Sequence, residues 1–256
     1  MDEKLVIFEQ PLSEYIRICL RLEYLFAQAR YFLAQQSTWD DHAALNTIIN
    51  LLNIADRPDI KSKLTNALHM HVSALTQLKQ ASEVDKTKLH FILDQLNKFI
   101  DILHHSHGKL GQPLLENEFL AAVRQRLNTP AGTIGFTMPA YHSWLQRSLD
   151  IRQHDLQRWL ASFNQIEAII NLLLQLIRDR SEPMTQKAYQ GFYQEPLQAG
   201  IPYQMIRIGL APATNIYPDI SIGRHRLAIH FFYLKDNGHG IQVTDDIEFQ
   251  LTYCKL

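Results

Sequence analysis

The chain has 256 residues, of which 46% are hydrophobic and 20% are charged. This composition is that of a folded globular protein and excludes an intrinsically disordered chain, which lacks the apolar surface needed to offset chain entropy. The 25 basic and 26 acidic residues give a formal net charge of -1, which argues against the basic surface of a nonspecific nucleic-acid binder.

The N-terminal residues MDEKLVIFEQPL contain acids and only a short apolar run, so they are not typical of a signal peptide or a membrane anchor. The most apolar helical segment, residues 166–179, is too short to span a bilayer. Cys19 and Cys254 are too few for a disulfide framework and are expected to be reduced thiols. We therefore expect a cytoplasmic protein without membrane insertion.

Apolar residues recur at helical spacing up to about residue 180. A short strand over residues 5–8 precedes a first helix, for which Ser13 is the expected N-cap. Asp40 or Asp41 is the expected cap of a second helix. Further helices are predicted, in chain order, over residues 58–78, 85–104, 114–127, 139–149 and 153–180.

From Pro183 onward the pattern changes to an alternation with period two, which is typical of β-strands. The alternating stretches cover residues 204–210, 224–234 and 245–254. Asn237-Gly238 is a strong hairpin signal between the last two, because both residues tolerate positive φ. The sequence predicts an α+β fold, with an N-terminal mainly helical bundle domain over 1–182 and a C-terminal antiparallel β domain over 183–256. The N-terminal strand is a candidate member of the sheet.

The motifs of common enzyme classes are absent from the sequence. It contains no glycine-rich phosphate loop, nucleophile elbow or HExxH zinc motif. His104, His105 and His107 mark a helix end, but sequence neighbours do not share a helix face, and no Cys or carboxylate follows at ligand spacing. The adjacent acids Asp245 and Asp246 are typical of a solvated turn. We therefore expect no enzymatic activity, no cofactor and no bound metal.

Cations gather on one face of the second β stretch. Its alternation assigns Leu227, Ile229, Phe231 and Tyr233 to a core face, and Arg224, Arg226, Ala228, His230 and Phe232 to the opposite face. Like charges at alternate strand positions repel each other unless an anion lies over them. One interpretation is an acidic partner molecule. The other is a set of internal salt bridges to Asp245, Asp246 and Glu248, which a hairpin register would bring opposite.

Several segments together resemble the ZapD family of bacterial cell division proteins, Z-ring-associated factors that bind the tubulin-like protein FtsZ. The segments are LVIFEQPLSEYIRICLRLEYL, AAVRQRLNTPAGTIGFTMPAYHSWL, GFYQEPL, IYPDISIGRHRLAIHFFYL and IEFQLTYC. None of them is a catalytic signature. Their order and their spread over nearly the whole chain make the set specific.

The resemblance implies a non-enzymatic cytoplasmic protein of the midcell division site that forms a homodimer and takes the FtsZ C-terminal tail in a positively charged pocket. Carried onto matching positions, the pocket residues are Arg224, Arg226 and His230 on the strand, with Arg21, Arg124, Arg126 and His142 on the helical side. Phe232 is expected to supply an apolar contact. His230 stands where the family commonly has a second arginine, and Glu118 stands where relatives can carry a cation.

A disordered tail loses chain entropy on binding, and a groove with cations and apolar walls offsets that loss. A symmetric dimer carries the groove twice, so two weak contacts would crosslink neighbouring filaments. Two alternatives stay open. One is a nucleic-acid-binding module that uses the arginine-rich strand, against which the near-neutral charge argues. The other is a hydrolase with His142 or His230 as base, for which the sequence offers no evident nucleophile.

Overall fold

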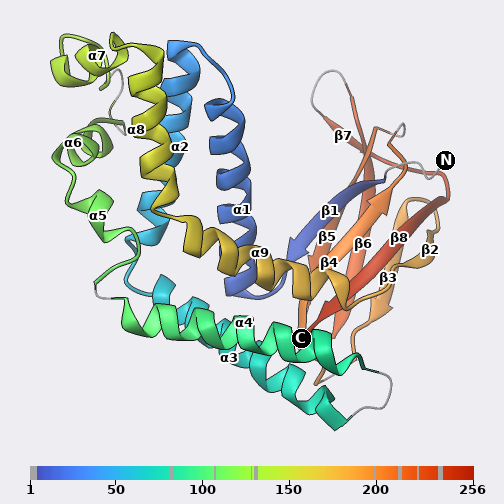
Figure 1. The fold of residues 1–256 in the computed structure, drawn as a ribbon. Helices are drawn as coiled ribbons and strands as arrows, with labels where there is room; N and C mark the ends of the chain where they lie inside the picture. Colours follow the sequence, from blue (N-terminus) through green and yellow to red (C-terminus); the bar gives the residue numbers. More distant parts are fainter. Residues whose placement is uncertain are drawn as a thin grey trace. The chain divides into compact units, whose positions relative to one another are not determined.

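The computed structural model describes residues 5–80, 84–106, 108–127, 129, 132–198, 200–212, 215–223, 225–235 and 239–256. After a first strand, helices α1 to α9 precede strands β2 to β8 (Figure 1). The predicted α+β class is confirmed. Residue contacts group the chain into the helical unit, Ile18–Leu174, and the β unit, Met1–Arg17 with Gln175–Leu256. The domain boundary predicted between residues 182 and 183 stays a prediction.

The helices are α1 (Glu14–Leu33), α2 (Thr38–Ala55), α3 (Ile60–Gln77), α4 (Lys86–His105), α5 (Gln112–Leu115), α6 (Glu118–Leu127), α7 (Pro139–Leu145), α8 (Leu149–Ala161) and α9 (Asn164–Asp179). Helices α2 and α4 begin where a side chain accepts hydrogen bonds from the first backbone N–H groups. Ser37 is the N-cap of α2: its Oγ accepts the Asp40 N–H at 3.1 Å, and the Asp40 carboxylate accepts the Ser37 N–H at 3.3 Å. The prediction that Asp40 or Asp41 is this cap was wrong, because the helix begins earlier and Asp40 lies in its first turn.

Other helix boundaries also differ from the prediction. Ser13 directly precedes α1, but its Oγ has no hydrogen-bond partner among the described residues. The helix predicted over 114–127 is divided into α5 and α6, because Asn117 Oδ1 accepts the Leu120 N–H at 3.0 Å and starts a new helix. The helix predicted over 153–180 is divided into α8 and α9, which are bent by 55°. In the described ranges no single helix is long and apolar enough to cross a membrane, although α8 and α9 together have the length and composition of a bent span.

A buried ion pair ties α2 to α8 and to the end of α7. Arg152 Nε donates to Asp41 Oδ2 at 2.5 Å, and Gln153 Nε2 donates to Asp41 Oδ1 at 3.0 Å. The Asp41 side chain is fully buried and that of Arg152 is 8% exposed, so each charge depends on the other for compensation. The Arg152 guanidinium also donates to the carbonyl oxygens of Leu145 and Arg147, which holds the end of α7.

An aromatic cluster packs α6, α7 and α8 together. Phe119 stacks on Trp159 with 5.7 Å between ring centroids, and Tyr141 stacks on Trp144 at 6.0 Å. Tyr141, Trp144 and Trp159 are all buried. Aromatic pairs of this kind contribute about 0.5–1.5 kcal/mol each beyond the area that they bury. The cluster therefore gives the short helix α7 a rigid base.

The described strands of the β unit form two antiparallel sheets. They are β1 (Val6–Pro11), β2 (Met184–Ala188), β3 (Phe192–Pro196), β4 (Tyr203–Leu210), β5 (Ile216–Ile222), β6 (Arg226–Leu234), β7 (Gly240–Gln242) and β8 (Ile247–Lys255). One sheet has the order β1-β4-β8-β2, and the other has the order β3-β6-β5 with β7 paired to β6. The N-terminal strand β1 joins the first sheet through a register that places Val6 opposite Leu210 and Pro11 opposite Met205.

Strand β6 pairs with the short strand β7 that follows it, and not with the longer strand β8. Phe232 of β6 lies opposite Gln242 of β7, whereas β8 lies between β2 and β4 in the other sheet. The predicted turn residues Asn237-Gly238 lie outside the described residues. A local turn signal indicates where the chain reverses, but the partner of each strand depends on the packing of the whole unit.

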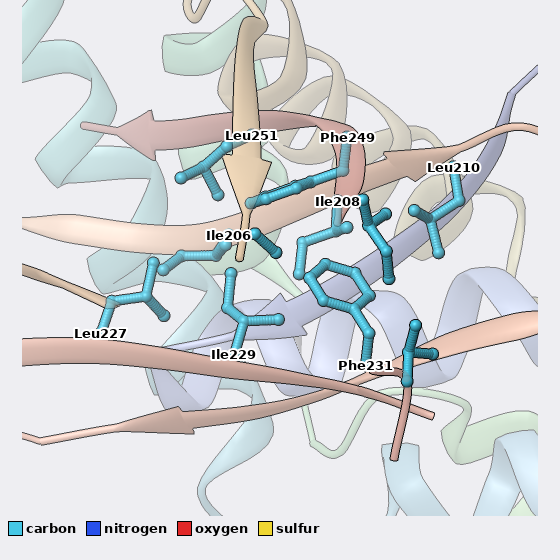
Figure 2. Close-up of a cluster of buried hydrophobic side chains, with 11 residues drawn as sticks. Ile206, Ile208, Leu210, Leu227, Ile229, Phe231, Phe249 and Leu251 are labelled. Atoms are coloured by element: carbon cyan, nitrogen blue, oxygen red, sulfur yellow. The ribbon is translucent and has the colours of Figure 1, made fainter. Parts of the chain in front are cut away.

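The two sheets pack face to face through side chains that point into the space between them. Figure 2 shows Leu227, Ile229 and Phe231 of β6 directed toward Ile206, Ile208 and Leu210 of β4 and toward Phe249 and Leu251 of β8. Leu227, Ile229 and Phe231 each have 0% exposure. The Phe231 and Phe249 ring centroids are 5.0 Å apart. The predicted core face of β6 is confirmed for these residues, and Tyr233 packs partly buried against the same cluster.

Phe231→Ala is expected to lower the free energy of unfolding by about 3–5 kcal/mol, because it leaves a cavity between the sheets. Phe232→Ala is the matched control, since the neighbouring ring lies half-buried on the opposite face of β6, and it should lower that free energy by a clearly smaller amount. Equilibrium urea unfolding measures both losses. Equal losses would contradict the assignment of the core face.

Candidate functional site

The outward side of β6 carries the predicted site residues of this strand. Successive side chains of a strand point to opposite sides, so the burial of the core residues turns Arg226, His230 and Phe232 outward. Arg226 is exposed, whereas His230 and Phe232 are half-buried. Arg224 precedes the strand and lies outside the described residues.

Strands β3 and β5 extend this surface with aromatic side chains. Phe192 of β3 and Asp219 of β5 flank His230 in the register, and Tyr217 of β5 lies opposite Phe232. The ring centroids of Phe192 and His230 are 4.6 Å apart, and Tyr217 stacks on Phe232 at 5.8 Å. The name outer face is used below for the set Phe192, Pro196, Tyr217, Asp219, Arg226, Ala228, His230 and Phe232.

Sequence reasoning missed Phe192 and Tyr217 as members of this surface. Both residues lie in stretches that resemble the ZapD family, so the segments were noticed but the residues were not. The available signal was their alternation with inward-facing residues such as Tyr193 and Ile216. That signal gives the face of each strand, but only the register of β3 and β5 on β6 brings the rings beside His230 and Phe232.

Arg226 has no ion pair with any residue that the structure describes. Its register neighbour on β3 is Pro196, which carries no charge. The acids considered as internal partners lie on or just before β8, where Asp246 binds Lys187 Nζ at 3.0 Å. Hydrogen bonds from the Gln190 N–H and from Lys187 lower the pKa of the Asp246 carboxyl group. The alternative of internal salt bridges to these acids is therefore wrong for Arg226, because β8 belongs to the other sheet.

Arg124 on α6, by contrast, is bound by internal partners. Its Nε donates to Asn53 Oδ1 at 2.6 Å, and its Nη2 donates to Asp56 Oδ2 at 2.7 Å. Asp56 also accepts a hydrogen bond from Lys109 Nζ at 2.6 Å, and the bonds from Lys109 and Arg124 lower the pKa of its carboxyl group. The Arg124 side chain is 29% exposed. A partner carboxylate would have to compete with Asp56 for this guanidinium.

The other helical residues of the predicted site are exposed. Arg21 on α1, Arg126 on α6 and His142 on α7 have no ion pair with another residue in the described part of the chain. Helices α6 and α7 share the aromatic cluster, so Arg126 and His142 lie on adjoining helices. These residues and Arg124 belong to the helical unit, whereas the outer face belongs to the β unit.

The surroundings of the two site histidines and of the two cysteines bear on the hydrolase alternative. His230 packs against Phe192, and the His142 ring lies beside Gly135. Both Cys19 and Cys254 are buried, and burial raises the pKa of their thiols to about 12 and about 11, which disfavours a nucleophilic thiolate. Across the described ranges, no group of three or more His, Cys, Asp or Glu residues is arranged to hold a metal ion.

Tyr141, the residue before His142, is anchored to α2 through its hydroxyl group. The hydroxyl forms a hydrogen bond with His42 Nδ1, and the two ring centroids are 5.8 Å apart. Burial lowers the pKa of His42. Burial and the nearby charge of Asp41 raise the pKa of Tyr141. Both groups are therefore neutral near pH 7, where the Tyr141 hydroxyl can donate its hydrogen bond to the unprotonated Nδ1 of His42.

Comparison with known proteins gives a consistent result over nearly the full chain. A family model described as "ZapD: Cell division protein" matches residues 20–230. A relative from Coxiella burnetii named "Cell division protein ZapD" is 42% identical over 253 residues, which cover 98% of this chain and 98% of the relative. Relatives with the same name from Methylococcus capsulatus and Chromobacterium violaceum are 32% and 34% identical, over 98% of this chain and 98% and 100% of the relatives.

The hydrogen bond between His42 and Tyr141 predicts a pH dependence of stability. The folded-state pKa of His42 lies below the unfolded value of about 6.5, so the unfolded chain takes up the proton first as the pH falls. The contribution of neutral His42 to the free energy of unfolding is complete above about pH 6.5 and declines below it. Urea unfolding between about pH 7.5 and 5.5 should therefore show a smaller loss of stability for His42→Asn than for the wild type.

His90→Asn is the matched control, because His90 is exposed on α4. It should follow the wild-type pH profile. A profile of His42→Asn that coincides with the wild type would contradict the role assigned to His42.

Proposed function

Because the chain belongs to the ZapD family of cell division proteins, we propose that it binds the C-terminal tail of FtsZ and, as a homodimer, crosslinks and bundles FtsZ filaments. This activity would place the protein in the cytoplasm at the midcell division site and would stabilise the Z-ring. The observation that carries the proposal is an exposed Arg226 that forms no ion pair with a described acid, on a sheet face that also presents paired aromatic rings.

Arg226 and the aromatic rings of the outer face suit an acidic peptide with apolar side chains. A guanidinium group binds a carboxylate with two parallel hydrogen bonds, and Arg226 is available for such a pair. The half-buried rings of Phe192 and Phe232 offer apolar contact area on the same face of the sheet as Arg226, beyond Ala228 in the register. A tail that is disordered before binding loses chain entropy, and a preformed face of cation and rings offsets that loss.

The helical unit adds basic side chains that suit the same partner. Arg21, Arg126 and His142 are exposed and form no ion pair with a described residue, so they can contact carboxylates without displacing a described acid. Arg124 would contribute only if the partner displaced or joined Asp56. We therefore expect Arg124 to contribute less to tail binding than Arg21, Arg126 and His142.

Dimerisation would convert modest tail affinity into filament bundling. A two-fold dimer presents the same tail-binding residues twice. A filament presents one tail on each subunit, so the second contact forms at a high effective concentration once the first has formed. Bundling therefore needs no additional contact between the filament bodies.

Arg226→Glu should weaken binding of a synthetic FtsZ C-terminal peptide by about 10-fold or more, because a hydrogen bond to a charged group contributes about 1.5–3 kcal/mol. Fluorescence anisotropy measures the affinity, and co-sedimentation with FtsZ filaments measures bundling. The variant should remain dimeric and folded, since Arg226 is exposed and without an ion pair to a described residue.

Lys255→Glu is the charge-matched control for this experiment. Lys255 is exposed at the end of β8 in the other sheet, so the same change of charge there should leave peptide binding unchanged. Wild-type binding by Arg226→Glu, or equal losses in both variants, would remove the outer face from the site. A gel shift with duplex and single-stranded oligonucleotides tests the nucleic-acid alternative on the same samples.

Peptide affinity should fall as salt is raised from about 50 to 300 mM, because contacts between exposed charges are screened over a Debye length of about 10 Å at 0.1 M. The Arg226→Ala variant should show a flatter dependence on salt than the wild type, since one charge contact is missing. Anisotropy titrations at stepwise salt concentrations measure both slopes. An affinity that does not change with salt would indicate a contact made mainly by the aromatic rings.

A further inference from the structure

We propose that the segment Gly132–Met138, called the 132–138 loop below, is a preformed apolar anchor on the helical unit that binds an acidic peptide next to Arg126 and His142. The inference rests on the proposed function, because the acidic peptide is taken to be the FtsZ tail. It adds to that function two apolar residues, Ile134 and Phe136, which the predicted site did not include.

The loop exposes two apolar side chains within three positions. Phe136 is 82% exposed and Ile134 is 45% exposed. Single exposed apolar residues are common on protein surfaces. Here the two side chains lie in one short loop between α6, which carries Arg126, and α7, which carries His142.

Hydrogen bonds within the loop hold it in one shape. The Thr137 hydroxyl lies 2.9 Å from the Gly132 carbonyl oxygen and 2.8 Å from that of Ile134. The backbone N–H groups of Thr137 and Met138 donate to the Ile134 carbonyl at 2.9 and 3.0 Å. A loop that is ordered before binding does not lose this conformational entropy when a partner arrives.

Two glycines bring the loop into close contact with the Arg126 backbone and the His142 ring. A Cβ on Gly132 would lie 2.0 Å from the Arg126 carbonyl oxygen, so only glycine fits there. A Cβ on Gly135 would lie 3.2 Å from the imidazole ring of His142. The loop is therefore packed against the backbone of Arg126 and the ring of His142, so its apolar side chains project from a segment that contacts both residues.

The loop is also anchored at its C-terminal end. Met138 is 6% exposed, and the following helix α7 buries Tyr141 and Trp144 in the aromatic cluster. The Tyr141 hydroxyl is bound to His42. The exposed side chains thus project from a fixed base.

The charges beside the loop favour an acidic peptide over other partners. Arg126 and His142 have no ion pair with another residue in the described ranges, so a carboxylate can bind them while an apolar side chain packs on Phe136 and Ile134. A symmetric contact between two copies through this loop would bring the same cations together, which opposes it. Binding to an anionic membrane commonly uses clusters of about four to eight basic residues, which Arg126 and His142 do not provide.

The test is a double variant, Ile134→Ser with Phe136→Ser, titrated with the synthetic FtsZ C-terminal peptide. Binding should weaken by about 10-fold or more, since two apolar contacts are lost. Phe91→Ser is the matched control: Phe91 is 61% exposed on α4, and its variant should bind the peptide like the wild type. Both variants replace exposed residues, and urea unfolding should show wild-type stability for each.

Each outcome is decisive. If the wild type binds the peptide, Arg226→Glu does not, and the double variant binds like the wild type, the loop inference is wrong and the proposed function stands. If the wild type does not bind the peptide, the proposed function fails and the inference fails with it. If the wild type is a dimer in sedimentation and the double variant is not, the loop belongs to a contact with a second copy. If the wild type binds anionic phospholipid vesicles and the double variant does not, the loop binds a membrane. Either result would also overturn the inference.

Discussion

Strand β6 lies between β3 and β5, and its inward side chains fill the space between the two sheets. A shift of its register by one residue would carry Arg226 and His230 into that core. Burial of a charge without a partner is strongly unfavourable, so the packing of Leu227, Ile229 and Phe231 enforces the outward direction of the cations. The candidate site on the β unit therefore follows from the same contacts that stabilise the unit.

The positions of the internal carboxylates determine which arginines are available to a partner. Arg152 is buried against Asp41, and Arg124 is bound to Asp56, so both stabilise the helical unit. Arg226 and Arg126 have no ion pair to a described residue. The chain thus has a near-neutral total charge, yet some of its cations are compensated internally and others remain free to bind acids. Total charge is a statement about the whole chain and does not reveal this division.

Cations and apolar side chains occur together on both units. On the β unit Arg226 lies on the same sheet face as the Phe192 and Phe232 rings, and on the helical unit Phe136 lies in the loop that follows the helix of Arg126. Charged groups contribute specificity and fast association, whereas apolar contacts contribute affinity that salt does not screen. Rigid placement by sheet register and by loop hydrogen bonds reduces the entropy lost on binding. Such surfaces suit the weak, repeated contact that the proposed bundling of filaments would require.

The sequence by itself determined that a mainly helical part precedes a β-rich part and which face of β6 is the core face, because both depend on residues close together in the chain. It also showed the resemblance to the ZapD family, through the order of several segments along the chain. Only the tertiary structure decided that β8 lies in the other sheet, that Phe192 and Tyr217 join the outer face, and that Asp56 binds Arg124. Arg124 and Asp56 are 68 positions apart. Local periodicity shows which side of an element is buried, but the partner on the other side is selected by the packing of the complete unit.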